Sequence, residues 1–145
     1  MTTILAVRHA DIDLPTLGTD PSLNSAGAQR ALALAQLTGS AGISTILTSQ
    51  FTRTKLTVAP TAQLLGLVPT VTPPPQELAQ QVRAGHLGNV ILIAGHSNTI
   101  PEVVAAFGAA PVPTIGERDF DNLFIITVLE SNLAGLLHLH YSRTP

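Results

Sequence analysis

The sequence contains no cysteine, which excludes disulfide bonds, zinc–thiolate sites and thiol nucleophiles. Aromatic residues make up only 3% of its 145 residues, and one lysine accompanies six arginines, so the stacking aromatics and basic runs typical of nucleic-acid-binding proteins are missing. No apolar run approaches the length of a membrane span, and no secretory signal is visible at the start. We therefore expect a cytoplasmic protein with neither a nucleic acid nor a membrane as partner.

Apolar residues make up 45% of the chain and charged residues 11%, with a net charge of −2. A chain of this length can form one domain with a sizeable core, so we expect a single domain over residues 1–145. The continuous apolar runs at residues 4–7 and 90–94 are typical of parallel strands that are buried on both faces.

Strand and helix patterns alternate along the rest of the chain. Further strands are expected at residues 45–48, 67–72, 123–129 and 136–141, and helices at residues 26–37, 52–65, 76–84 and 99–107. Pro60 is expected to kink the second helix. The last two strands are close enough in sequence to form a hairpin, which makes at least one edge strand antiparallel. The order predicts an α/β fold, a three-layer sandwich with a mostly parallel central sheet and helices on both faces.

Basic side chains follow two of these strands and begin one helix. Arg8 and His9 come directly after the first apolar run, His96 follows the run at residues 90–94, and Arg53 lies in the first turn of a helix. Ligands of open α/β sheets bind at the carboxyl ends of the strands. If the two strands are neighbours, the imidazoles face each other across a gap of about the size of a phosphoryl group. The arginines and the helix N-terminus would complete an anion site that needs no metal.

This set of residues suits phosphoryl transfer, which depends mainly on positioning and charge stabilisation. His9 would attack phosphorus, and water would later release the phosphate. Neighbouring guanidinium groups would keep its imidazole neutral. A leaving alkoxide needs a proton, and Asp11 and Glu77 are the candidate donors. Arg30 is expected on a solvated helix face.

Several segments resemble the histidine phosphatase superfamily, the phosphoglycerate mutase-like group. They are VRHA at residues 7–10, TSQFTRT at 48–54, GHSNT at 95–99 and the first-helix segment at 20–35. The resemblance implies a phosphohistidine at His9, with Arg8, Arg53 and His96 binding the phosphoryl group and with no cofactor. Ala10 departs from the family pattern, which usually has glycine there.

The chain lacks the insertions with which larger mutases of this family hold sugar phosphates. The resemblance therefore implies hydrolysis by a short phosphatase, whose partner is a small phosphorylated substrate or a phosphohistidine protein. Some short members carry an acid directly after the RH-small triplet, which favours Asp11 as proton donor. The substrate and the oligomeric state stay open.

A serine hydrolase is one alternative, because Gly95-His96-Ser97 resembles the G-x-S-x-G nucleophile elbow. The remaining members of its triad would be Asp119 or Asp121 and His138 or His140. Thr99 stands where that motif has glycine, and this interpretation leaves Arg8 without a role.

A non-catalytic phosphate- or ligand-binding module on the same fold is the other alternative. It would keep the anion site without turnover, in keeping with Ala10 and the unassigned proton donor.

Overall fold

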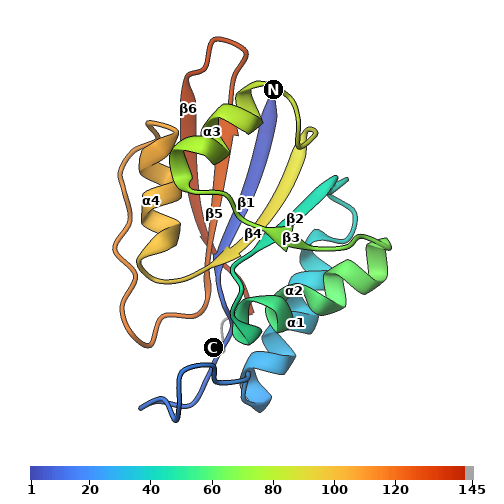
Figure 1. Cartoon of the computed structure of the whole chain (residues 1–145), viewed down its shortest axis with the longest axis vertical. Helices are drawn as coiled ribbons and strands as arrows, with labels where there is room; N and C mark the ends of the chain where they lie inside the picture. Colours follow the sequence, from blue (N-terminus) through green and yellow to red (C-terminus); the bar gives the residue numbers. More distant parts are fainter. Residues whose placement is uncertain (143–145) are drawn as a thin grey trace.

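The computed structural model describes residues 1–142, so the last three residues of the expected single domain lie outside the description. Its strands are β1 (Thr2–Arg8), β2 (Thr45–Thr48), β3 (Thr70–Val71), β4 (Val90–Gly95), β5 (Asn122–Val128) and β6 (Ala134–His140). They form one sheet in the order β3-β2-β4-β1-β5-β6 (Figure 1). The first four strands in this order are parallel, whereas β5 is antiparallel to β1 and β6 is antiparallel to β5.

Four helices cover the two faces of the sheet. They are α1 (Ser25–Thr38), α2 (Thr52–Leu65), α3 (Pro75–Arg83) and α4 (Thr99–Ala106). Helices α1 and α2 lie together on one face, and α3 and α4 lie on the other (Figure 1). The predicted three-layer α/β sandwich with an antiparallel edge is confirmed. Within the described residues, no helix has both the length and the apolarity needed to span a membrane.

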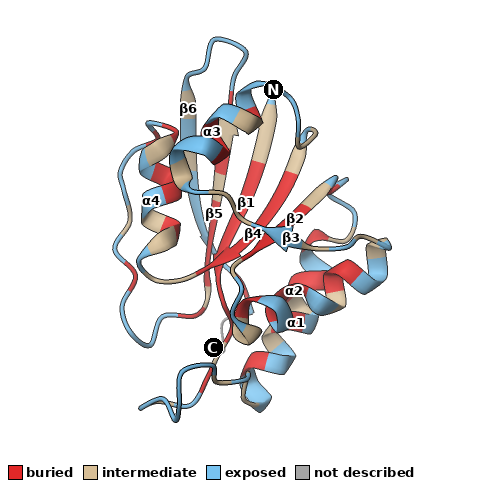
Figure 2. Cartoon of the chain, in the orientation of Figure 1, coloured by how far each residue is buried: buried red, intermediate tan, exposed pale blue. Residues whose placement is uncertain are grey.

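The central strands are buried on both faces because their apolar residues alternate between two cores. Ile4 and Ile91 pack with α3 and α4, whereas Leu5 and Leu92 pack with α1 and α2. Burial is concentrated in β1, β4 and β5, in the middle of the sheet (Figure 2). This double-sided burial fixes the positions of the strand ends, from which the polar residues project.

Local signals set most of the element ends. The Asn24 side chain caps α1 by accepting the N–H of Gly27 at 2.9 Å, and Gly66 ends α2 with a left-handed φ of 67°. Helix α2 continues through Pro60 over its whole length. Strand β3 has only two of the six residues expected, because Pro69 lacks an N–H and restricts the residue before it.

Candidate active site

The two sequence-predicted histidines leave the sheet side by side. Strands β1 and β4 are parallel neighbours whose register pairs Arg8 with Gly95, and the N–H of His9 donates to the Gly95 carbonyl at 2.8 Å. The rings of His9 and His96 consequently lie with their centroids 5.4 Å apart. A Cβ on Gly95 would lie 2.8 Å from Oγ1 of Thr99, so the close approach of α4 to this strand end requires glycine.

His9 is held in one tautomer by the backbone. Its Nδ1 lies 2.8 Å from the carbonyl oxygen of Ala10. A carbonyl can only accept, so Nδ1 carries the proton and Nε2 keeps its lone pair. Burial lowers the pKa of His9 to about 4, assisted by the positive charges of Arg8 and Arg53. The imidazole is therefore neutral at pH 7, and burial is a larger cause than the guanidinium groups that the sequence had indicated.

His96 is oriented by a pair of hydroxyl groups. Its Nε2 lies 2.8 Å from Oγ of Ser49, and this oxygen lies 2.8 Å from Oγ1 of Thr54. Burial, followed by the charges of Arg53 and Arg8, lowers the pKa of His96 to about 4. A second neutral imidazole thus faces His9.

The two arginines present unpartnered hydrogen-bond donors. Nη1 of Arg8 donates to the carbonyl groups of Gly116, Glu117 and Asp119, which fixes this side chain to the loop before β5. The guanidinium carbon of Arg53 lies 4.5 Å from the centre of the Phe51 ring. Nε of Arg8 and both Nε and Nη1 of Arg53 are buried without a partner among residues 1–142. Such donors are costly to leave unpaired, and an oxyanion would satisfy them.

Arg8, His9, Arg53 and His96 line one cavity of about 500 Å³, which we call the histidine pocket. Parts of the loop over residues 9–24, Ser97 and Glu117 complete its lining. The four residues that the sequence predicted for phosphate binding are brought together here. Among the described residues, no three histidine, aspartate or glutamate side chains are grouped so that they could hold a metal ion.

Asp11 does not line the histidine pocket. Its Oδ1 accepts from Nε of Arg30 at 2.6 Å, and Arg30 also donates to the carbonyl of Tyr141 at 3.0 Å. The Asp11 backbone rests on Gly27 of α1, where a Cβ would collide with it. Its carboxylate is committed to Arg30 and lies outside the lining, so the structure does not bring the expected proton donor Asp11 together with the histidines. The expectation of a solvated Arg30 is wrong for the same reason.

Glu77, the other candidate donor, is also absent from the pocket lining. Its Oε1 accepts from Nε2 of Gln81 at 3.3 Å on the exposed side of α3. The carboxyl-bearing residue that does line the histidine pocket is Glu117, from the loop before β5.

The alternative serine triad is not assembled. Ser97 lines the histidine pocket, but neither His138 nor His140 does. His138 Nε2 lies 2.7 Å from Oδ1 of Asn122, and His140 lies 3.4 Å from a carboxylate oxygen of Asp121.

Three supporting residues were missed by sequence reasoning. Asp20 accepts the N–H and the hydroxyl of Thr52, at 2.8 and 2.6 Å, and so ties the long loop to the start of α2. Thr57 accepts the N–H of Ala10 at 2.7 Å, and Ser49 contacts His96. Asp20 and Ser49 lie in the segments that carry the family resemblance, but the sequence around each residue does not indicate which residue it bonds.

Comparison with known proteins adds the following. Residues 4–79 match the sequence model of the histidine phosphatase superfamily (branch 1). No curated protein sequence matches the chain. The protein histidine phosphatase SixA, solved with tungstate, superposes with a TM-score of 0.78 at 17% identity, over 96% of this chain and 97% of that one. A mycobacterial glucosyl-3-phosphoglycerate phosphatase with inorganic phosphate gives 0.71 at 14% identity, over 99% and 98%. At these identities the likeness shows the fold.

Proposed function

The chain belongs to the histidine phosphatase superfamily, branch 1, and on this premise we propose that it hydrolyses phosphomonoesters or phosphohistidine through a covalent phosphohistidine at His9. One observation carries the proposal: the unpartnered, buried donors of Arg8 and Arg53 surround two neutral imidazoles in one pocket. This is an anion site with a nucleophile already in it.

In the first step, Nε2 of His9 attacks phosphorus and forms an N–P bond while the bond from phosphorus to the leaving group breaks. Arg8, Arg53 and His96 bind the phosphoryl oxygens and stabilise the charge that develops on them. Water then attacks phosphorus, the N–P bond breaks, and His9 regains its lone pair as inorganic phosphate leaves. The leaving group takes up one proton, and the attacking water loses one.

The substrate class follows from the position of the carboxyl groups. Asp11 is bound to Arg30 and Glu77 lies outside the pocket, so neither is placed to protonate an alkoxide. Glu117, the carboxyl-bearing residue in the lining, is exposed to solvent and not buried beside the imidazoles. Phosphohistidine and aryl or acyl phosphates have leaving groups that need little such help. We propose these over alkyl phosphate esters. The resemblance of the fold to SixA, a protein histidine phosphatase, supports phosphohistidine among them.

Hydrolysis of p-nitrophenyl phosphate tests the proposal. Wild-type protein should turn over and should give a phosphorylated species that is stable in base and labile in acid. His9→Asn should give neither, whereas His86→Asn, at an exposed histidine, should match the wild type. Arg53→Ala should lose on the order of 3 kcal/mol of transition-state stabilisation, a loss typical of a missing oxyanion donor.

A non-catalytic phosphate-binding module is the second candidate, favoured by the absence of Asp11 and Glu77 from the pocket. Calorimetric binding of inorganic phosphate by the wild type, without turnover of p-nitrophenyl phosphate, acetyl phosphate or a phosphohistidine peptide, would select it.

A further inference from the structure

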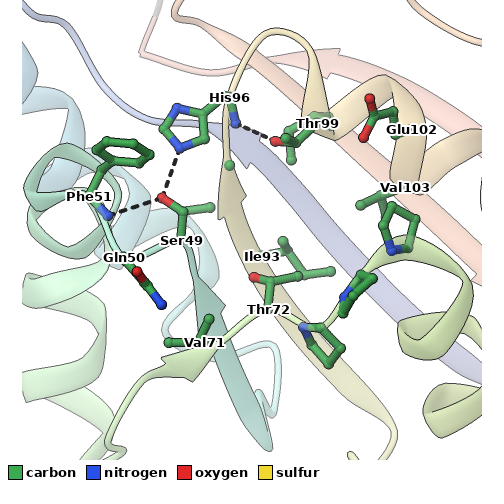
Figure 3. A pocket seen from close by; sticks show the side chains of 16 residues that line it. Ser49, Gln50, Phe51, Val71, Thr72, Ile93, His96, Thr99, Glu102 and Val103 are labelled. Carbon is green, nitrogen blue, oxygen red and sulfur yellow. Dashed lines mark hydrogen bonds between the residues drawn. The ribbon is translucent and has the colours of Figure 1, made fainter. Parts of the chain in front are cut away.

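A second cavity, of about 400 Å³, adjoins the histidine pocket, and we call it the apolar cavity. It lies at the carboxyl end of β4, between the turn before α2 and the first turns of α4 (Figure 3). Phe51, His96 and Thr99 line both cavities. His96 therefore stands at the boundary between the two cavities, beside both His9 and the apolar cavity.

The apolar cavity lacks the positive charges that line the histidine pocket. Its wall is largely apolar and includes Val71, Ile93, Val103 and the prolines at 73–75. Of the described residues that line it, only His96 and Glu102 are ionisable, and no arginine or lysine is among them. Because the low pKa of His96, about 4, leaves it neutral at pH 7, Glu102 is the one charged side chain. An anionic group would be repelled here, whereas the histidine pocket attracts one.

One polar atom in this wall lacks a partner. Oγ1 of Thr72 is buried and makes no hydrogen bond within residues 1–142. Thr72 lies beside Val71 and the prolines, across the cavity from His96 (Figure 3). A buried hydroxyl left unpaired is costly, and a bound molecule with one polar group could satisfy it.

We propose that the apolar cavity binds the leaving group of the substrate, and that this group is an uncharged ring, so that carboxylate-bearing leaving groups are rejected. The proposal rests on the proposed function, since it needs a phosphoryl group in the histidine pocket. The cavity volume lies within the range of small-molecule sites, which are largely apolar with a few placed polar groups.

The test compares two aryl phosphates, 1-naphthyl phosphate and 4-carboxyphenyl phosphate, at low ionic strength. The ratio of their kcat/KM values should exceed about tenfold in favour of naphthyl, a discrimination typical of an apolar pocket. Val71→Lys places a positive charge in the wall, which attracts the carboxylate and disfavours the apolar ring, so it should reduce the ratio to about one. Val68→Lys is the matched control, because Val68 is 84% exposed and outside the cavity lining, and it should keep the wild-type ratio.

Glu102→Gln is the second variant, at an exposed position in the first turn of α4. It should lower the ratio about threefold by improving 4-carboxyphenyl phosphate, the effect of removing one partly screened charge. A wild-type ratio near one, or equal ratios for Val71→Lys and Val68→Lys, would overturn the proposal.

If the protein is not a phosphatase, the apolar cavity can still be tested by binding. If no phosphate compound is turned over, calorimetric Kd values for the same two aryl phosphates replace kcat/KM. A preference for naphthyl that Val71→Lys removes would then support the apolar cavity as a binding site, whereas equal Kd values would reject it.

Discussion

The carboxylate of Asp11 lies 2.6 Å from Nε of Arg30, and the side chains of Arg30 and Asp11 are only 15% and 17% exposed. This ion pair joins the loop that follows the first histidine to α1, and Arg30 extends the link to the backbone of Tyr141 at the end of β6. Asp11 therefore joins elements around the histidine pocket and is absent from its lining.

Asp11→Asn should lower the free energy of unfolding by about 1–2 kcal/mol, because the variant replaces a charge-assisted hydrogen bond with a neutral one. Denaturant unfolding measures this loss, and Asp13→Asn, at an exposed carboxylate of the same loop, serves as the control. Turnover of an alkyl phosphate and of p-nitrophenyl phosphate should fall by the same factor. A loss confined to the alkyl ester would restore Asp11 to the role of proton donor.

The low pKa values of both histidines predict how stability depends on pH. His9 and His96 have pKa values of about 4 in the folded protein, against about 6.5 for an unperturbed histidine. Between pH 4 and 6.5 the unfolded chain binds more protons, so the free energy of unfolding should decrease as the pH falls from 6.5 to 4. Above pH 7 the two groups should contribute no slope.

NMR titration of the ring protons checks this prediction directly. The two signals that disappear in His9→Asn and in His96→Asn should titrate near pH 4, and each variant should show a shallower decline of stability between pH 6.5 and 4. A midpoint near 6.5 for either signal would mean that burial and the arginines do not act on that ring.

The sequence predicts those parts of the site that depend on strand ends. The apolar runs of β1 and β4 identify two buried parallel strands. Ligands bind at the carboxyl ends of such strands, so His9 and His96, which follow these ends, are predicted to lie close together. Arg53 follows from its place at the start of α2. These positions depend on local pattern and a general topology rule, so one chain is enough to infer them.

The remaining parts depend on contacts between segments far apart in the sequence. Asp11 is two residues from His9, yet its partner is Arg30, because the loop packs on Gly27 of α1. The three carbonyls that hold Arg8 come from a loop more than a hundred residues away. No periodicity or motif encodes such pairings, so neither the short spacing nor the family resemblance that favoured Asp11 could indicate Arg30 as its partner.

Asp20 is predicted to hold the loop that lines the histidine pocket. Phe51, at the N-cap of α2, makes no side-chain hydrogen bond, and Asp20 supplies the missing acceptor to Thr52 from a distance. The hydrogen bonds from Thr52 lower the pKa of Asp20, so this link is lost only as the pH falls below the ordinary range of an aspartate.

Asp20→Ala should raise KM for p-nitrophenyl phosphate several-fold and change kcat less, because the loop would no longer close the pocket beside Arg53. Asp20→Asn, which keeps an acceptor oxygen, should recover part of the loss, and Ser22→Ala, at an exposed serine of the same loop, is the control. An unchanged KM in Asp20→Ala would show that the loop holds its position without this link.

Ser49 is predicted to position His96 for phosphoryl binding. Its hydroxyl is 2.8 Å from Nε2 of His96, and Thr54 holds that hydroxyl in place from the first turn of α2. Ser49→Ala would leave a largely buried ring nitrogen unpaired, so kcat/KM should fall about tenfold, equivalent to about 1.4 kcal/mol.

The conservative variant separates positioning from packing. Ser49→Thr keeps the hydroxyl and should restore most of the activity, whereas Ser40→Ala, at an exposed serine after α1, should leave it unaltered. The ¹⁵N NMR shifts of His96 should change in Ser49→Ala and return in Ser49→Thr, because the tautomer of the ring depends on the partner of Nε2. If Ser49→Ala retained full activity with unchanged shifts, the hydroxyl would have no part in orienting His96, and the arginines alone would have to fix the phosphoryl group.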